Sequence, residues 1–288
     1  MSSASKGKKA AVTAEPRWGA AHTTSENGGK KGGGGLGVGG APATAQSAEE
    51  IEVEFLAQYD ASKFERPSVA VDVALLTVAG DAIETVLLER AEPPHQGRFA
   101  LPGSFVAMDE SLDHAASRVL KEKAGLAGVF LEQLYTFGAP KRDPRTRVIS
   151  VAYYALVSRE QLGDAIEPHL VRLEIPWESE TGGEVFAFSK TGKELTLAFD
   201  HATILGTAIK RIRGKLDYAP IGFQLLPERF TLLELLRVHE IVLGRPLNKD
   251  SFRRRMLASG QLEATGELQQ NVEHRPAELY RFARRSAI

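Results

Sequence analysis

Apolar runs mark the expected strands in the first two thirds of the chain. Residues 69–78 (VAVDVALLTV) and 84–89 (ETVLLE) are β-rich runs, separated by a turn signal at Ala79-Gly80-Asp81. Residues 148–157 (VISVAYYALV) have the continuous apolar character of a buried strand. Residues 185–199 indicate two more strands around a hairpin turn at Thr191-Gly192. These runs predict a sheet that contributes to a packed core.

Two segments have helical periodicity instead. In residues 111–124 apolar side chains recur at helical spacing, and Gly125 follows as a candidate C-cap. The apolar stripe of this helix comprises Leu112, Ala115, Ala116, Val119 and Leu120. Residues 201–216 carry a second stripe, and the cations Lys210, Arg211, Arg213 and Lys215 are expected largely off it. We expect this second helix to connect or to dimerise.

A smaller helical unit begins near Phe230. Thr231 and Glu234 have the spacing of a capping box, and Gly244 can end the helix that they start. Asn248 can cap a second helix, which Gly260 can close. Residues 262–266 and 277–282 are candidate strands after these helices. Two short helices across a tight turn, followed by two strands, predict a winged helix-turn-helix.

The second of these helices, KDSFRRRMLASG, carries an arginine run. We expect Phe252, Met256 and Leu257 to face the core, which turns the opposite side of the helix to solvent. An arginine presented to the major groove can pair with guanine. The DNA-binding candidates are Asn248, Lys249, Ser251, Arg253, Arg254, Arg255 and, between the two strands, Arg275. An isolated charged run would be an ordinary solvated helix, but the turn, the caps and the wing around it favour DNA binding.

Bulk composition sets few limits. The net charge of −1 gives no hint of a polyanion partner, so a basic surface has to be local. The chain has no cysteine, which excludes disulfides and thiolate zinc sites. No apolar run is long enough for a membrane span, so no membrane partner is expected. We expect a cytoplasmic protein, associated with the nucleoid when bound to DNA.

Residues 102–126 (PGSFVAMDESLDHAASRVLKEKAGL) resemble the Nudix box, the phosphate-handling motif of Nudix hydrolases. Ser104 occupies the slot of the box glycine, and Glu110 follows after five residues. Seven more residues lead to Arg118, and Gly125 closes the motif without a gap. Length and register therefore imply a Nudix-type α/β/α domain.

The Nudix resemblance implies a metal site that this chain lacks. In the hydrolases, carboxylates at i, i+3 and i+4 of one helix hold Mg²⁺. Here the three slots hold Val119, Glu122 and Lys123. We therefore predict no catalytic residues and no bound metal, with weak or absent hydrolysis. Lys123 either contacts a ligand phosphate where a metal would lie or is an ordinary solvated residue, and both readings stay open.

A basic loop precedes the buried strand at 148. Residues 141–147 (KRDPRTR) contain four cations, which could hold a pyrophosphate through charge-assisted hydrogen bonds. Basic surface loops also occur for solubility alone. The candidate ligand-binding residues are Arg98, Phe105, Lys123, Arg142, Arg145 and Arg147.

Together these motifs resemble Nudix-related transcriptional regulators of the NrtR type. The resemblance covers about residues 55–285 and is most specific in the segment LLPERFTLLELLRVHEIVLGRPLNKDSFRRRMLASGQLEATGE. It implies a repressor of NAD biosynthesis or salvage genes that binds a palindromic operator as a homodimer. It also implies ADP-ribose or a related NAD-derived effector in the Nudix pocket, with no cofactor required. Ser251 and Arg255 stand where many relatives carry Asn and Lys, so the operator sequence cannot be transferred.

The predicted fold class is α+β, an N-terminal Nudix-like α/β/α domain followed by a C-terminal winged helix-turn-helix. We expect a disordered Gly-rich tail at 1–48, a ligand-binding domain at 49–218, a linker at 219–227 and a DNA-binding domain at 228–288. The alternative function is an active ADP-ribose Nudix pyrophosphatase with an accessory nucleic-acid-binding module. A third is a ligand-binding adaptor whose C-terminal unit contacts protein.

Overall fold

The structure is a computed structural model that describes residues 47–178, 180–216, 219–270 and 275–283. Contacts divide the chain into two units, residues 1–61 and 62–288. The first unit contains helix α1 (Ala48–Gln58), whose N-cap Ser47 forms a capping box with Glu50. This helix starts slightly ahead of residue 49, where the sequence predicts the ligand-binding domain to begin. The predicted disordered tail otherwise falls on residues outside the described ones.

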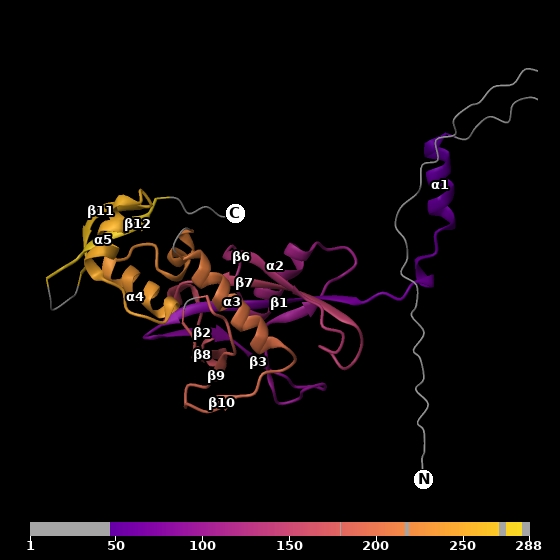
Figure 1. Cartoon of the computed structure of the whole chain (residues 1–288), viewed down its shortest axis with the longest axis horizontal. Coiled ribbons are helices and arrows are strands. Elements are labelled where there is room, and N and C mark those ends of the chain that lie inside the picture. The colour runs from indigo at the N-terminus through magenta and orange to yellow at the C-terminus, as the bar shows by residue number, and fades with distance from the viewer. Residues whose placement is uncertain (1–46, 179, 217–218, 271–274, 284–288) are drawn as a thin grey trace, which may run out of the picture. The chain divides into compact units, whose positions relative to one another are not determined.

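The second unit holds both predicted domains (Figure 1). Its first part contains η1 (Ala61–Lys63, at the unit boundary), β1 (Ser68–Ala79), β2 (Ala82–Val86), β3 (Leu88–Glu89), β4 (Phe99–Ala100), β5 (Gly103–Phe105), α2 (Leu112–Ala124), β6 (Phe130–Phe137) and β7 (Val148–Leu156). Then follow η2 (Arg159–Gln161), η3 (Glu167–His169), β8 (Leu170–Glu174), β9 (Phe186–Phe188), β10 (Glu194–Leu195), α3 (His201–Lys215) and η4 (Pro220–Leu225). The last part comprises α4 (Leu232–Leu243), α5 (Lys249–Ala258), β11 (Leu262–Leu268) and β12 (Glu278–Phe282).

A mixed sheet lies at the centre of the first domain. Its strand order is β10-β9-β8-β2-β1-β7-β6, with β5 paired to β1, and the central pair β1 and β7 is parallel. Alternate residues of β1 pack on opposite faces, Val73 with helix α2 and Ala74 with helix α3. This confirms the predicted α/β/α layers. The predicted strand 84–89 is two strands, because β3 leaves the sheet and pairs with β4.

The local signals for α2 and for the β9–β10 hairpin are confirmed. Ser111 caps α2, and Gly125 ends it in the left-handed conformation with φ 65°. Gly192 has φ 80° in the turn between β9 and β10. A side chain at either position would be strained, so the glycines fix where these elements end.

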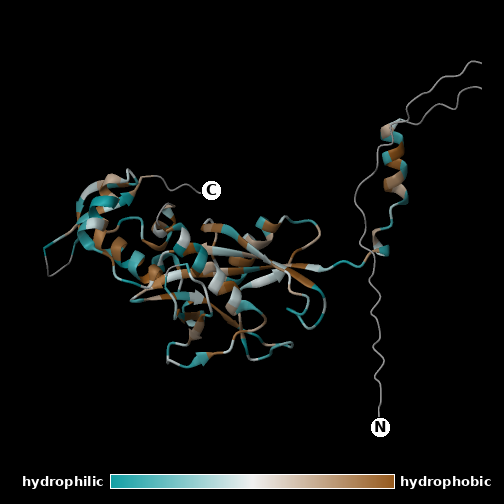
Figure 2. Cartoon of the chain, in the orientation of Figure 1, coloured by the Kyte–Doolittle hydropathy of each residue, from teal (hydrophilic) through white to brown (hydrophobic). Residues whose placement is uncertain are grey.

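The C-terminal domain has the predicted order of helix, turn, helix and two strands. The capping box of Thr231 and Glu234 starts α4, and Gly244 ends it with φ 72°. The side chain of Asn248 accepts a hydrogen bond from the Ser251 N–H at the start of α5. Strands β11 and β12 are antiparallel and form the wing. In Figure 2 the colouring is mostly hydrophilic over α5, which contrasts with the apolar core strands.

Packing joins the two domains within the second unit. The predicted linker is largely the 3-10 helix η4, whose Ile221 and Phe223 are buried in the same core as α3 and α4. Arg213 was predicted off the apolar stripe of α3, but it is only 3% exposed. Its Nε donates to the Val242 carbonyl of α4 at 2.6 Å, and its guanidinium lies over the Trp177 ring. A buried guanidinium thus ties α3 to the winged domain.

Candidate functional site

A pocket of about 250 Å³ opens beside the central sheet of the first domain. Its walls come from β1, β5, the basic loop before β7 and the start of α3. The glycine preceding Ser104 is needed here: a Cβ on Gly103 would lie 2.3 Å from Oδ1 of Asp72. The strands therefore approach closely, and the pocket floor carries polar groups from β1.

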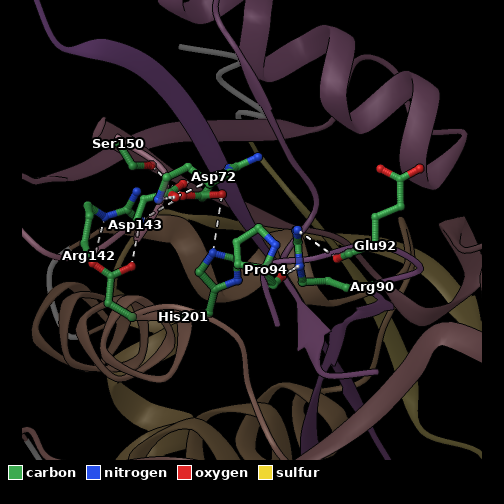
Figure 3. A network of polar contacts seen from close by, with 10 residues as sticks. Asp72, Arg90, Glu92, Pro94, Arg142, Asp143, Ser150 and His201 are labelled. Carbon is green, nitrogen blue, oxygen red and sulfur yellow. Dashed lines mark hydrogen bonds and ion pairs between the residues drawn. The ribbon is translucent and has the colours of Figure 1, made fainter. Parts of the chain in front are cut away.

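The floor of the pocket is a network around Asp72 (Figure 3). Ser150 Oγ donates to its carboxylate at 2.5 Å, and Arg142 Nη2 lies 3.3 Å from the same oxygen. Arg142 also makes two hydrogen bonds to Asp200, at 2.9 and 2.6 Å. Burial opposes its charge, but the hydrogen bond to Asp200 and the charges of Asp200 and Asp72 raise the pKa of Arg142 overall. Its side chain is 4% exposed, so Arg142 holds the pocket together.

His201, the first residue of α3, completes this floor. The Leu101 N–H donates to its Nδ1 at 2.9 Å, and its Nε2 lies 3.6 Å from Oδ1 of Asp72. Burial lowers the pKa of the imidazole below its ordinary value. Because Nδ1 accepts a hydrogen bond, the proton of the neutral ring lies on Nε2, toward Asp72.

The basic loop contributes a second paired arginine. Arg145 makes bidentate contacts with Asp143, at 3.0 and 2.8 Å, and lies 5.5 Å from the centre of the Phe105 ring. The hydrogen bond from Arg145 lowers the pKa of Asp143. Arg145 is about half exposed, so it forms the rim of the pocket.

The structure brings together only half of the candidate ligand-binding residues. Phe105, Arg142 and Arg145 line the pocket. The other three, Arg98, Lys123 and Arg147, are exposed and are absent from its walls. Arg147 donates instead to the Ala139 carbonyl. The sequence placed these three residues close to the Nudix-like motif or the basic loop, but it could not show in which direction each side chain points.

Several pocket residues had not been singled out from the sequence, among them Asp72 and His201 of the floor, Arg90 and Phe199. Arg90, at the end of the β2–β3 segment, lies with its guanidinium 4.9 Å from the centre of the Phe199 ring. Phe199 has φ 51° and contacts His95, which has φ 63°, with their ring centres 4.8 Å apart. A positive φ is uncommon for residues other than glycine, so the sequence does not predict this backbone conformation at Phe199.

On and around helix α2, the residues of the Nudix-like motif pair with one another. Arg118 bonds Glu110 at 2.6 Å and Glu122 at 3.4 Å, and it also reaches the Ser104 hydroxyl at 3.5 Å. The hydrogen bond from Arg118, with a second from the Ala107 N–H, lowers the pKa of Glu110 to about 2. Val119 is fully buried against the sheet.

Carboxylates do not gather on this helix in the way a metal needs. Among the described residues there is no group of three or more His, Cys, Asp or Glu side chains that could hold a metal ion. Lys123 is exposed, as a solvated residue would be. The box residues present therefore do not fit the Mg²⁺ site of a Nudix hydrolase.

Helix α5 presents its arginines to solvent. Phe252 and Met256 are buried and hold the helix on the winged domain. The candidates Asn248, Lys249, Ser251, Arg253, Arg254, Arg255 and Arg275 are all exposed. Lys249, Arg253 and Arg275 line a common groove between α5 and the wing. The prediction that Leu257 faces the core was wrong, because it is 46% exposed on the last turn of α5.

Comparisons with known proteins match both halves of the chain. A model of the NrtR DNA-binding winged helix domain matches residues 222–282, and a NUDIX domain model matches 66–181. An ADPR responsive transcriptional repressor NtrR of Acinetobacter baylyi is 37% identical over 238 residues, covering 81% of this chain and 88% of the relative. The chain belongs to the NrtR family.

Two further matches concern the two domains of the family. The crystal structure of Shewanella oneidensis NrtR complexed with a 27mer DNA has 32% identity and a TM-score of 0.62, covering 74% of this chain and 93% of that one. An ADP-ribose pyrophosphatase of Methanocaldococcus jannaschii is 37% identical over 87 residues, covering 30% of this chain and 49% of the relative. The similarity to a repressor therefore spans both domains, whereas the similarity to this hydrolase is confined to a part of the chain. In the described part of the chain, no helix is both long and apolar enough to cross a membrane.

Proposed function

We propose that this NrtR-family chain is a transcriptional repressor of NAD biosynthesis or salvage genes that responds to ADP-ribose. It binds a palindromic operator as a homodimer and requires no cofactor. The observation that carries the proposal is the exposed arginine face of α5, Arg253–Arg255, on a winged domain that shares a hydrophobic core with the Nudix domain. A relative that matches 81% of the chain is named as an ADPR responsive repressor.

The DNA contacts follow from the geometry of α5. A recognition helix enters the major groove with its N-terminal part, where Asn248, Lys249 and Ser251 lie. Arg254 points away from the buried Phe252 and is placed to read a base edge, since an arginine pairs with guanine O6 and N7. Arg275, in the wing, contacts backbone or minor groove. A two-fold pair of such helices matches a palindromic site.

The ligand pocket acts as a sensor in this proposal. Arg142 and Asp72 shape its floor, and Phe105 with Arg145 forms the rim over which a nucleotide lies. Hydrolysis is lost because the three metal slots hold Val119, Glu122 and Lys123, and the first of these is packed in the core. Because the ligand is bound and not hydrolysed, the fraction of protein with an occupied pocket follows the concentration of the ligand.

The alternative is an active ADP-ribose pyrophosphatase with an accessory nucleic-acid-binding module, and the similarity to the archaeal enzyme keeps it open. Two box carboxylates, Glu110 and Glu122, remain. Purified protein with Mg²⁺ and ADP-ribose separates the two functions. Release of AMP and ribose phosphate at about 1 s⁻¹ or faster would favour the enzyme.

DNA binding is tested by selecting duplexes from a random library with the full chain, since this needs no knowledge of the operator. We expect enrichment of a palindromic sequence. Recovery of no common sequence would count against a repressor and favour an adaptor that contacts protein. The salt dependence of binding to the selected duplex should be steep, because phosphate contacts release counterions.

A further inference from the structure

The pocket contains three arginines, and two of them are already neutralised by carboxylates. Arg142 is bonded to Asp200 and lies near Asp72. Arg145 is bonded to Asp143 through two nitrogens. In a bidentate pair the carboxylate balances the charge of the guanidinium and occupies two of its N–H donors. Such an arginine therefore binds an incoming anion less strongly.

Arg90 is placed differently. Its Nε donates to the Pro94 carbonyl at 2.7 Å and its Nη2 to the Glu92 carbonyl at 3.4 Å (Figure 3). Within the described residues, no carboxylate forms an ion pair with it. Carbonyl oxygens fix the position of the guanidinium without cancelling its positive charge. That charge is felt inside the pocket: burial is the main cause that lowers the pKa of His201, and the field of Arg90 adds to it.

An aromatic pair holds Arg90 from below. Phe199 lies under the guanidinium, and His95 packs edge-on against Phe199. Both aromatic residues have a positive φ, a conformation that costs about 1–3 kcal/mol and clusters at binding sites. The guanidinium is therefore preorganised, which lowers the entropy cost when a ligand binds to it.

We propose that Arg90 is the anion-binding group of the pocket and donates hydrogen bonds to a phosphate oxygen of a nucleoside diphosphate. Arg90 thus takes the anion-binding role that the sequence suggested for the basic loop, and the arginines of that loop stabilise the shape of the pocket. It rests on the proposed function only in the choice of ADP-ribose as the effector. The aromatic pair below Arg90 keeps its remaining N–H groups in place, and Phe199 directly precedes Asp200 and α3.

Calorimetric titration of the full chain tests this with two probes, ADP-ribose and inorganic pyrophosphate. Arg90→Met removes the charge and keeps much of the side-chain length, and Arg90→Lys keeps the charge. The matched control is Arg172→Met, which removes an exposed arginine of β8 that lies outside the pocket. We expect Arg90→Met to raise Kd about 10- to 100-fold, the worth of one charged hydrogen bond. Arg90→Lys should stay within about fivefold of wild type, and Arg172→Met should match wild type.

Two results would overturn the assignment. One is an unchanged Kd for Arg90→Met. The other is an Arg90→Lys variant as weak as Arg90→Met, which would mean that the carbonyl contacts matter and the charge does not. A wild-type chain that binds pyrophosphate and not ADP-ribose would refute the proposed effector, while the pyrophosphate titration would still decide the role of Arg90.

Discussion

Replacing Arg142 should destabilise the protein more than losing any surface ion pair. Arg142→Met leaves Asp72 and Asp200 close together without the cation between them. Removing one partner of a buried ion pair costs about 3–5 kcal/mol, because the other charge stays buried. Asp200 is 22% exposed and keeps some hydration, so we take the lower end, about 3 kcal/mol.

Urea denaturation followed by circular dichroism measures this loss. A thermal melt followed by the same signal should show a fall in Tm of roughly 6–12 °C, at about 2–4 °C per kcal/mol. Arg281→Met is the matched control, since Arg281 and Glu263 form a pair with both side chains about half exposed. Its expected cost is about 1 kcal/mol or less. Equal effects of the two substitutions would refute the reasoning, because burial of Arg142 would then carry no energetic weight.

Three further outcomes follow from the site and the winged domain. Burial lowers the pKa of His201, so the free energy of unfolding should fall as the pH drops below about 6.5, where the unfolded imidazole gains a proton. His201→Asn keeps an acceptor for the Leu101 N–H but removes the titrating imidazole. Urea titrations at pH 7.5 and 5 should then show a smaller fall in the free energy of unfolding than in the wild type, and an equal fall would contradict this prediction. Arg254→Ala should weaken binding to the selected duplex about 5- to 150-fold in fluorescence anisotropy and leave the Kd for ADP-ribose unchanged, whereas loss of both would point to misfolding. An NMR titration should place the Glu110 pKa near 2, and Arg118→Met should return it toward 4.5; a normal value in the wild type would disprove their pairing.

Local signals in the sequence predicted most of the fold. The capping box of Thr231 and Glu234, the cap at Asn248 and the glycines at 125 and 244 act within a few residues of their own position. Such contacts can be inferred from spacing alone. The Nudix box likewise kept its length and register, so Glu110 and Arg118 could be aligned before the structure showed them paired.

Long-range packing is what the sequence did not reveal. Arg213 follows the charged pattern of an exposed helix face, yet its side chain is buried. Its Nε donates to the carbonyl of Val242, which lies in the winged domain. Leu257 has the periodicity of a core residue, but its side chain on the last turn of α5 is 46% exposed. The burial of each of these two side chains depends on how distant elements pack in the folded protein, which local spacing does not show.

The pocket shows the same limit at the level of side chains. Arg142 and Arg145 of the basic loop at 141–147 line the pocket, but they pair with Asp200 and Asp143, which composition cannot predict. Arg90 was overlooked because it stands alone at the end of an apolar run. Its surroundings, Phe199 and His95 in left-handed conformations, are set by the fold.

The central claim, a nucleotide pocket that controls an arginine-bearing helix, is tested most directly by one titration. The full chain is titrated against the selected duplex by fluorescence anisotropy, with and without saturating ADP-ribose. We expect the Kd for DNA to shift by about 5- to 150-fold, the usual size of coupling between two sites. The same Kd with and without ADP-ribose, under conditions where calorimetry shows the nucleotide bound, would contradict the account.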